Sequence, residues 1–152
     1  MTRRLEVAVE RWPIAGRFTI ARGAKSEAIV VVATLREGAC LGRGEAVPYP
    51  RYGETVAGVA EAIRAVGGAL ADGMDRQGLM KNLPAGAARN AIDCALWDLE
   101  AKISGRRAAA IAGLAALRPL ETAYTLSLGT PEEMGAAAAA AAPGTSTPVA
   151  NR

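Results

Sequence analysis

Few residues in this chain are of the types that carry out chemistry, and the missing types exclude whole classes of site. The sequence contains no histidine, which excludes Ser-His-Asp hydrolysis and His-ligated zinc or iron sites within these 152 residues. Its two cysteines, Cys40 and Cys94, are too far apart for a CxxC motif and too few for a disulfide framework. We expect Cys94, one residue from an apolar helical stripe, to be an inert buried thiol.

The acids Asp93, Asp98 and Glu100 are close enough in sequence to raise the possibility of a metal site. All three fall on one predicted helix, and Arg89 and Lys102 lie four residues from Asp93 and Asp98. Opposite charges at that spacing stabilise the surface of a helix. We therefore predict ion pairs here, and no metal site.

Arg22 is the clearest candidate for binding a ligand. It lies in the segment 13–27, which, apart from a short strand-like piece at 18–20, is too polar and too rich in glycine for a continuous strand and is long enough to be a functional loop. A guanidinium group binds a carboxylate through two parallel hydrogen bonds. A solvated loop arginine fits the residues equally well, so the residues alone leave both interpretations open. Phe18, in the same segment, fits either a pocket wall or the core.

The elements that must position these residues begin with a small sheet. Apolar and polar residues alternate from Leu5 to Glu10, which is typical of a strand with one wet face. The β-branched run 28–35 predicts a strand covered on both faces, and a hairpin turn leads from it into a strand at 40–46. Pro13 is expected to end the first strand, because proline lacks the amide hydrogen used in pairing.

The middle of the chain is predicted to be helical. Thr55 is a suitable N-cap for a helix that Gly67-Gly68 would end, and Asp75 is suitable for a second, shorter helix. The strongest helical periodicity runs over residues 86–104, where apolar residues recur at three- and four-residue spacing. Trp97, in this last helix, is interpreted as a packing anchor.

The pattern changes after residue 118 to one strand followed by one helix. Residues 122–128 predict a strand, and Thr130 and Glu133 form a capping box before an almost pure alanine helix that ends at 142. A single strand and helix cannot complete an α/β layer. We therefore predict a domain at 1–118, the incomplete beginning of a second domain at 119–142, and an unpatterned tail at 143–152.

Charge and hydropathy argue against two classes of partner. The 18 Lys and Arg are spread among 15 Asp and Glu without a basic block of five, which argues against nucleic-acid binding. The charged N-terminus has no apolar run after it, and no stretch reaches 18 strongly apolar residues. We therefore expect neither a signal peptide nor a membrane span, and a cytoplasmic location.

Three segments, taken together, carry a family resemblance. They are RGEAVPYPRYGE at 43–54, PAGAARNAIDCALWDL at 84–99 and YTLSLGTPEEM at 124–134. In this order and spacing they resemble the N-terminal part of dipeptide epimerases in the muconate-lactonizing subgroup of the enolase superfamily. The residues IARG at 20–23 resemble the L-Ala-D/L-Glu epimerase type in particular. The resemblance covers roughly residues 3–142.

The resemblance implies an α+β fold. Residues 1–118 would form an enolase-type N-terminal capping domain, with a three-stranded antiparallel sheet and a helical bundle. Residues 119–142 would form the first strand and helix of a (β/α) barrel. In the family, lysines at the carboxyl ends of later barrel strands move the α-proton, and three acids there hold Mg²⁺. None of those groups falls within this chain, so the resemblance implies no catalytic residue and no Mg²⁺ ligand here.

The resemblance also implies where a substrate would be bound. Arg22 would bind the carboxylate of a glutamyl dipeptide, with Phe18 beside it. Tyr52 would contact the substrate from a second loop, and Thr125 would do so from the end of the first barrel strand. Glu54, in the second loop, is equally well suited to facing the substrate and to stabilising a helix N-terminus.

The function implied for the full-length enzyme is Mg-dependent 1,1-proton transfer at the α-carbon of a dipeptide such as L-Ala-D/L-Glu. Members of the family are often homo-oligomeric. Three other activities of the same subgroup remain open: cycloisomerase, o-succinylbenzoate synthase and N-acylamino acid racemase. A non-catalytic, cap-like remnant is a further alternative.

Overall fold

The computed structural model describes residues 2–20, 23–114, 116–120 and 123–141, without the side chains of 15–18 and 20. The chain divides into two compact units. Residues 1–12 and 28–117 form the first unit, and residues 13–27 and 118–152 form the second. The tail predicted at 143–152 lies outside the described residues.

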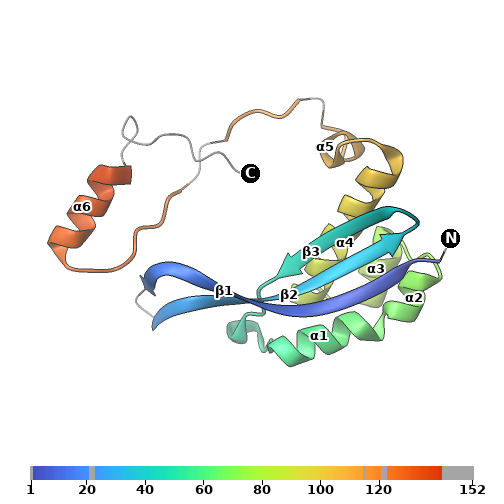
Figure 1. Cartoon of the computed structure of the whole chain (residues 1–152), viewed down its shortest axis with the longest axis horizontal. Helices are drawn as coiled ribbons and strands as arrows, with labels where there is room; N and C mark the ends of the chain where they lie inside the picture. Colours follow the sequence, from blue (N-terminus) through green and yellow to red (C-terminus); the bar gives the residue numbers. More distant parts are fainter. Residues whose placement is uncertain (1, 21–22, 115, 121–122, 142–152) are drawn as a thin grey trace. The chain divides into compact units, whose positions relative to one another are not determined.

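Three strands form one sheet in the order β1-β2-β3 (Figure 1). They span Arg4–Ile20, Gly23–Glu37 and Cys40–Ala46. β2 and β3 pair antiparallel in a tight hairpin, with Val31 opposite Ala46 at one end and Glu37 opposite Cys40 at the other. The predicted three-stranded antiparallel sheet is therefore confirmed.

The short strand-like piece predicted at 18–20 is confirmed as part of β1. The loop predicted for the rest of 13–27 is wrong for the residues that the structure describes there. β1 continues through Pro13 to Ile20, and β2 begins at Gly23. A proline can remain in an edge strand when its missing N–H would point away from the neighbouring strand. β1 is an edge strand of this sheet, so Pro13 does not end it. Arg22 lies outside the described residues.

The helices of the first unit follow the sheet in sequence. A short 3-10 helix, η1, spans Pro50–Tyr52. The α-helices are α1 Val56–Ala65, α2 Gly67–Ala71, α3 Arg76–Asn82, α4 Ala87–Ser104 and α5 Ala108–Ile111. Both predicted N-caps are confirmed, because the Thr55 hydroxyl accepts from Gly58 N–H at 3.0 Å and the Asp75 carboxylate from Gly78 N–H at 2.7 Å.

The predicted end of the first helix before Gly67-Gly68 is confirmed, because α1 ends at Ala65 with Val66 as its C-cap. The two glycines then begin a further helix, α2, which the sequence did not predict. α2 carries Leu70, whose side chain is fully buried in the core. Burying a leucine side chain is worth about 1.5–3 kcal/mol, which offsets the roughly 1 kcal/mol that each of the two glycines costs in a helix.

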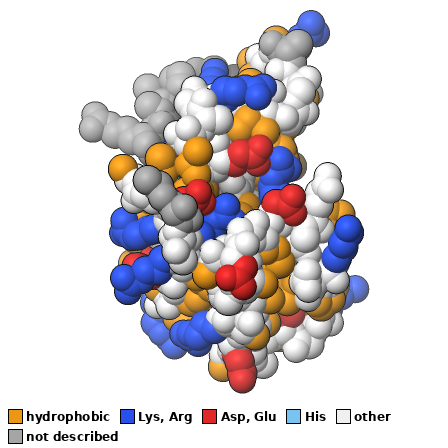
Figure 2. Space-filling view, turned by 90° about the vertical axis from the view of Figure 1, so that its right-hand side faces the viewer, with side chains coloured by type: hydrophobic (Ala, Val, Ile, Leu, Met, Phe, Trp, Pro, Cys, Tyr) orange, Lys and Arg blue, Asp and Glu red, His pale blue; other side chains and the backbone are white. Residues whose placement is uncertain are grey.

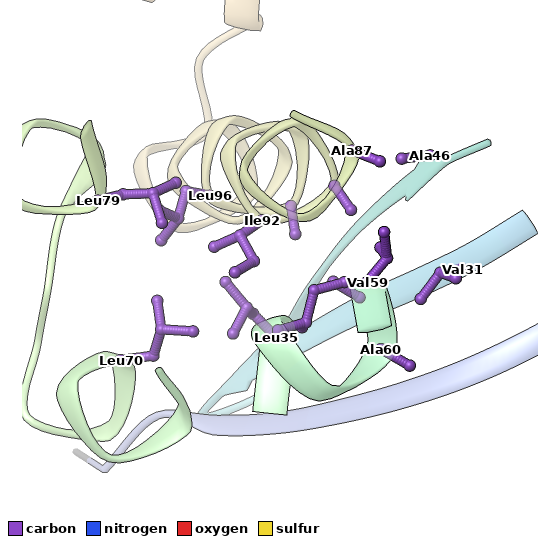
Figure 3. Close-up of a cluster of buried hydrophobic side chains, with 14 of the residues drawn as sticks. Val31, Leu35, Ala46, Val59, Ala60, Leu70, Leu79, Ala87, Ile92 and Leu96 are labelled. Carbon is purple, nitrogen blue, oxygen red and sulfur yellow. The ribbon is translucent and has the colours of Figure 1, made fainter. Parts of the chain in front are cut away.

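The core lies between the sheet and helices α1–α4 (Figure 3). Val31 and Leu35 of β2 meet Val59 of α1 and Ile92 of α4 in this cluster, and all four side chains are at most 5% exposed. Leu70 and Leu79 extend it beneath α2 and α3. Apolar residues also remain on the surface, and Figure 2 shows hydrophobic atoms between charged side chains of both signs.

Two glycines let α4 pack directly on β3. A Cβ atom at Gly42 would lie 2.6 Å from Leu99 Cβ and would also meet the Ala95 carbonyl oxygen. A Cβ atom at Gly44 would lie 2.6 Å from Ala95 N and would meet the Ala91 carbonyl oxygen. Real Cβ atoms do not approach other atoms so closely, so these positions require glycine.

The strand predicted at 122–128 is not present in the described residues, because 123–130 have no regular secondary structure. A strand needs a neighbour to complete its hydrogen-bond ladder, and this segment makes one backbone hydrogen bond to β1, from Leu128 N–H to Thr19 O at 2.9 Å. The helix after it, α6 Pro131–Ala141, is confirmed. Its capping box is also present, with Thr130 N–H 2.8 Å from Glu133 Oε2.

Candidate functional site

The loop after β3 presents two aromatic rings to solvent. Tyr49 precedes η1 and Tyr52 is its last residue, and their ring centroids are 5.6 Å apart with the planes tilted by 46°. Tyr52, a predicted substrate contact, is 77% exposed. Gly53 closes the turn in the left-handed region at φ 74°, which glycine adopts without strain. The loop therefore holds Tyr52 in a defined place with its ring accessible to a ligand.

Glu54 anchors this loop to the N-terminus of α4. One carboxylate oxygen accepts from Tyr49 N–H at 2.9 Å, and the other accepts from Ala87 N–H at 2.6 Å. These two backbone hydrogen bonds, the one from Ala87 first, lower the pKa of the Glu54 carboxyl. Glu54 thus stabilises a helix N-terminus, and that helix is α4 rather than the adjacent α1.

A cleft of about 560 Å³ lies beside the loop. It is lined by Tyr52 and Glu54 of the loop and by Pro84, Gly86 and Ala88 around the start of α4. Both oxygens of Glu54 are already bound by backbone amides. The cleft can therefore offer an aromatic ring and apolar contacts, whereas Glu54 is not placed for acid–base chemistry.

In the second unit, the end of β1 is hydrogen-bonded to the segment before α6. Leu128 N–H donates to Thr19 O at 2.9 Å, and Thr19 N–H donates to Ser127 Oγ at 3.0 Å. Phe18 precedes Thr19 in β1, although its side chain lies outside the described atoms. Thr125 is exposed two residues before Ser127. Two segments predicted to contact substrate thus meet here.

The acids on α4 do not gather into a metal site. Asp98 forms the predicted ion pair with Lys102 at 2.8 Å, and Glu100 pairs with Arg76 at 2.9 Å. Arg89, predicted to pair with Asp93, instead donates to the Leu83 carbonyl oxygen at 3.5 Å. Within the described ranges, no cluster of three or more Cys, Asp or Glu side chains could hold a metal ion.

Two interpretations of α4 residues need correction. Trp97, interpreted as a packing anchor, is half-buried and stacks under the Arg76 guanidinium, whose carbon lies 3.4 Å from the ring centroid. Cys94, expected to be buried, is exposed. Partial desolvation by nearby atoms, and then the Asp93 charge, raise the pKa of its thiol, which keeps it protonated and unreactive at neutral pH. The apolar periodicity of α4 did not show that Trp97 and Cys94 lie at the edge of its apolar stripe, where side chains are only partly covered or exposed.

Replacing Glu54 with glutamine is expected to destabilise the chain at neutral pH, because an amide has one acceptor oxygen for two backbone N–H groups. The folded pKa of Glu54 is lowered, so the carboxylate stabilises the fold above the unfolded value of about 4.3 and loses this effect as the pH falls through the folded pKa. Urea unfolding of both proteins at a series of pH values measures the difference. That difference should be largest near pH 7 and shrink in acid; a pH-independent difference would contradict this role.

Residues 2–113 match the family described as "Mandelate racemase / muconate lactonizing enzyme, N-terminal domain". The chain belongs to this family. The fold is accordingly that of an enolase-type N-terminal capping domain, as the three-stranded sheet and its helices already indicated. None of the helices in the described ranges is long and apolar enough to cross a membrane.

Two curated relatives are similar to the chain. An L-Ala-D/L-Glu epimerase of Escherichia coli (strain K12) is 48% identical over 132 residues, which cover 87% of this chain and 41% of the relative. An N-acetyl-D-glutamate racemase of Pseudoalteromonas sp is 38% identical over 107 residues, which cover 69% of this chain and 34% of the relative. The chain thus spans about two fifths of the epimerase and a third of the racemase, and both relatives are isomerases.

The solved structures that are similar to this chain include dipeptide epimerases and a protein with homology to them. An enolase family member from Agrobacterium tumefaciens, described as having homology to dipeptide epimerases, is 51% identical with a TM-score of 0.86, over 90% of this chain and 42% of that chain. It contains sodium and L-Ala-L-Glu, with an ordered loop. Other solved dipeptide epimerases that resemble this chain contain magnesium and a dipeptide.

Proposed function

We propose that this chain supplies the capping domain and the substrate-recognition loops of a dipeptide epimerase. The observation that carries the proposal is the 48% identity to the E. coli L-Ala-D/L-Glu epimerase across 87% of this chain. The reaction is a 1,1-proton transfer at the α-carbon of a dipeptide such as L-Ala-D/L-Glu. In this proposal the chain positions the substrate, and the remaining three fifths of such an enzyme provide the acid–base groups.

The proposal assigns the substrate contacts to four residues. Arg22 binds the dipeptide carboxylate, and Phe18 shapes the pocket beside it. Thr125 contributes a hydroxyl from the segment that is hydrogen-bonded to the end of β1, which supports placing it near Phe18. Tyr52 contributes its exposed ring from the loop that Glu54 anchors.

Magnesium belongs to the proposal for the full-length enzyme, because solved relatives contain it. The described residues of this chain do not fit the ion, since they hold no cluster of three metal-ligating side chains. No step through magnesium is therefore assigned to this chain. We propose residues 1–118 as the capping domain, 119–142 as the beginning of the barrel and 143–152 as an unpatterned tail.

A chimera tests the proposal directly. Residues 1–130 of this chain would replace the aligned region of the E. coli epimerase, which is 48% identical there. Proton exchange at the α-carbon of L-Ala-L-Glu would be followed by NMR in D₂O with Mg²⁺. We expect exchange within tenfold of the parent enzyme. A folded chimera in which the α-proton exchanges no faster than in buffer alone would favour a non-catalytic cap.

Replacing Arg22 with lysine in this chimera should raise KM for L-Ala-L-Glu by about 5- to 150-fold. This range corresponds to the roughly 1–3 kcal/mol of hydrogen bonds to charged groups, because an ammonium cannot form the two-pronged contact of a guanidinium. Arg64→Lys, at an exposed position of α1, is the matched control and should leave KM unchanged. An unaltered KM in Arg22→Lys would remove Arg22 from the site.

The relative that racemises N-acetyl-D-glutamate supports a second candidate, an N-acylamino acid racemase. Both substrates present an acylated glutamate, so the same arginine could bind either. The ratio of kcat/KM for L-Ala-L-Glu to that for N-acetylglutamate, compared between the chimera and the parent epimerase, separates the two. A ratio that falls at least tenfold in the chimera favours the racemase.

A further inference from the structure

α4 begins without a capping side chain of its own, in contrast to α1 and α3. Those two helices are capped by Thr55 and Asp75, each of which accepts a hydrogen bond from the backbone N–H three residues further along. The residue before α4 is Gly86, which has no side chain that could accept such a bond. The first four N–H groups of an α-helix have no partner within the helix. This helix of 18 residues therefore needs an acceptor from another part of the chain.

Glu54 supplies that acceptor from the loop after β3, 33 residues before Ala87. Its Oε1 accepts from Ala87 N–H at 2.6 Å, and its Oε2 accepts from Tyr49 N–H at 2.9 Å. Hydrogen bonds to a carboxylate are roughly twice as strong as those between neutral groups. A single side chain therefore joins the beginning of the loop to the first turn of α4.

Gly86 leaves the space that the Glu54 carboxylate occupies. A Cβ atom at Gly86 would lie 2.8 Å from Glu54 Oε1, which is closer than real Cβ atoms approach other atoms. Because Oε1 is the end of a flexible side chain, the carboxylate would move away from Ala87 N–H to relieve this contact. The position before a helix often carries a capping side chain. Here that position is open, and a side chain from a distant loop takes the place of the local cap.

The loop at 49–53 has little else to hold it against the helices. Its other backbone hydrogen bonds are internal, because Tyr52 N–H donates to Tyr49 O and Gly53 N–H donates to Pro50 O, both at 2.9 Å. η1 contains no buried residue, and the Tyr52 side chain is exposed. The place of the Tyr52 ring relative to α4 therefore depends on the Glu54 carboxylate.

We infer that Glu54 and Gly86 are positioning residues for the substrate, which together fix the loop that presents Tyr52 and so set the affinity for the dipeptide. The inference rests on the proposed function, in which Tyr52 contacts the dipeptide. Glu54 acts through Tyr52, and Gly86 acts through Glu54. Their effect on catalysis should therefore appear in KM, and it should vanish when the Tyr52 ring is removed.

Amide hydrogen exchange of the full 152-residue chain, followed residue by residue by NMR, tests whether this contact holds the loop. In Glu54→Gln the side chain has one acceptor oxygen for two N–H groups. We expect the Tyr52 amide to exchange at least about tenfold faster, relative to the amide of the buried Val59 in α1. Gly86→Ala should have the same effect by an independent route, because it displaces the carboxylate without changing it. A Tyr52 amide as well protected in both folded variants as in the wild type would overturn the inference.

Asp75→Ala is the matched control, because it removes a helix cap that does not touch the loop. Exchange of the Gly78 amide, which donates to Asp75, should become faster, while exchange of the Tyr52 amide should stay the same. If Asp75→Ala accelerates exchange at Tyr52 as much as Glu54→Gln does, the effect is a general loss of stability and the inference fails.

Kinetics of the chimera test the consequence for the substrate. Glu54→Gln and Gly86→Ala should each raise KM for L-Ala-L-Glu by about fivefold or more and leave kcat within about twofold, whereas Asp75→Ala should leave KM unchanged. With Tyr52→Ala already present, neither change should raise KM further. An unchanged KM in both variants, or a rise that persists without the Tyr52 ring, would overturn the inference. An inactive parent chimera would instead refute the proposed function, and the exchange rates of the Tyr52 amide would then decide whether Glu54 and Gly86 hold the loop.

Discussion

Replacing Gly44 with valine is expected to destabilise the chain by at least about 3 kcal/mol, the upper part of the range for overpacked cores. A Cβ atom there would lie 2.6 Å from Ala95 N and 2.7 Å from Cys94 Cβ. Because the nearest obstacles are backbone atoms of α4, no change of side-chain rotamer relieves the clash, and α4 must move off the sheet. That loss is a large part of the roughly 5–15 kcal/mol that stabilises a typical domain.

Urea unfolding followed by circular dichroism measures this effect as a shift of the transition midpoint. Strand propensity alone predicts the opposite sign, because valine is favoured in strands and glycine is not. Gly68→Ala is the matched control, since a Cβ atom there meets no other atom within 4 Å. Gly68 lies in α2, so alanine should be neutral or stabilise by up to about 1 kcal/mol. A Gly44→Val protein as stable as the wild type would show that α4 does not rest on β3 as described.

The 152-residue chain alone is expected not to exchange the α-proton of L-Ala-L-Glu, whereas the active chimera should exceed the uncatalysed rate by at least about 10⁶-fold. Removing a proton next to a carboxylate needs a positioned base and stabilisation of the enediolate. Lys102 is bound to Asp98 and to the Leu41 carbonyl oxygen. Glu54 is bound by two backbone amides. Arg22 stays protonated and cannot act as a base.

To test this second prediction, the pure chain is incubated with L-Ala-L-Glu and Mg²⁺ in D₂O, and the exchange of the α-proton is followed by NMR. The Arg22→Ala chain, purified in the same way, controls for host epimerase, because a contaminant gives equal exchange in both samples. Exchange that requires Arg22 in the isolated chain would contradict the prediction and reveal a catalytic group within these residues.

Local signals in the sequence were sufficient to predict most of the helices. Thr55, Asp75 and the pair Thr130–Glu133 each form the predicted cap, because a cap depends on residues within one turn of each other. The apolar periodicity of α4 likewise marks its buried face, from Ala91 to Leu99. The ion pair of Asp98 with Lys102 was predictable for the same reason.

The candidate site was predictable only in part. The sequence pointed to the loop that carries Tyr52 and to the segment that carries Thr125. It did not show that Glu54 would bind the first turn of α4, because Ala87 is 33 residues away and no local pattern connects them. The bonds between Thr19 and residues 127–128 span more than 100 residues, and only the folded chain brings them together.

By itself, the sequence determined the α+β class, the positions of most helices and the family, since each depends on local periodicity, capping or motif order. The tertiary structure decided that β1 continues past Pro13 and that 123–130 is not a strand. It also decided that α4 packs directly on β3 at Gly42 and Gly44. These outcomes depend on which strand lies at the edge of the sheet and which element lies beside it. Pairing and close packing are properties of neighbours in space, and neighbours far apart in sequence leave no local pattern.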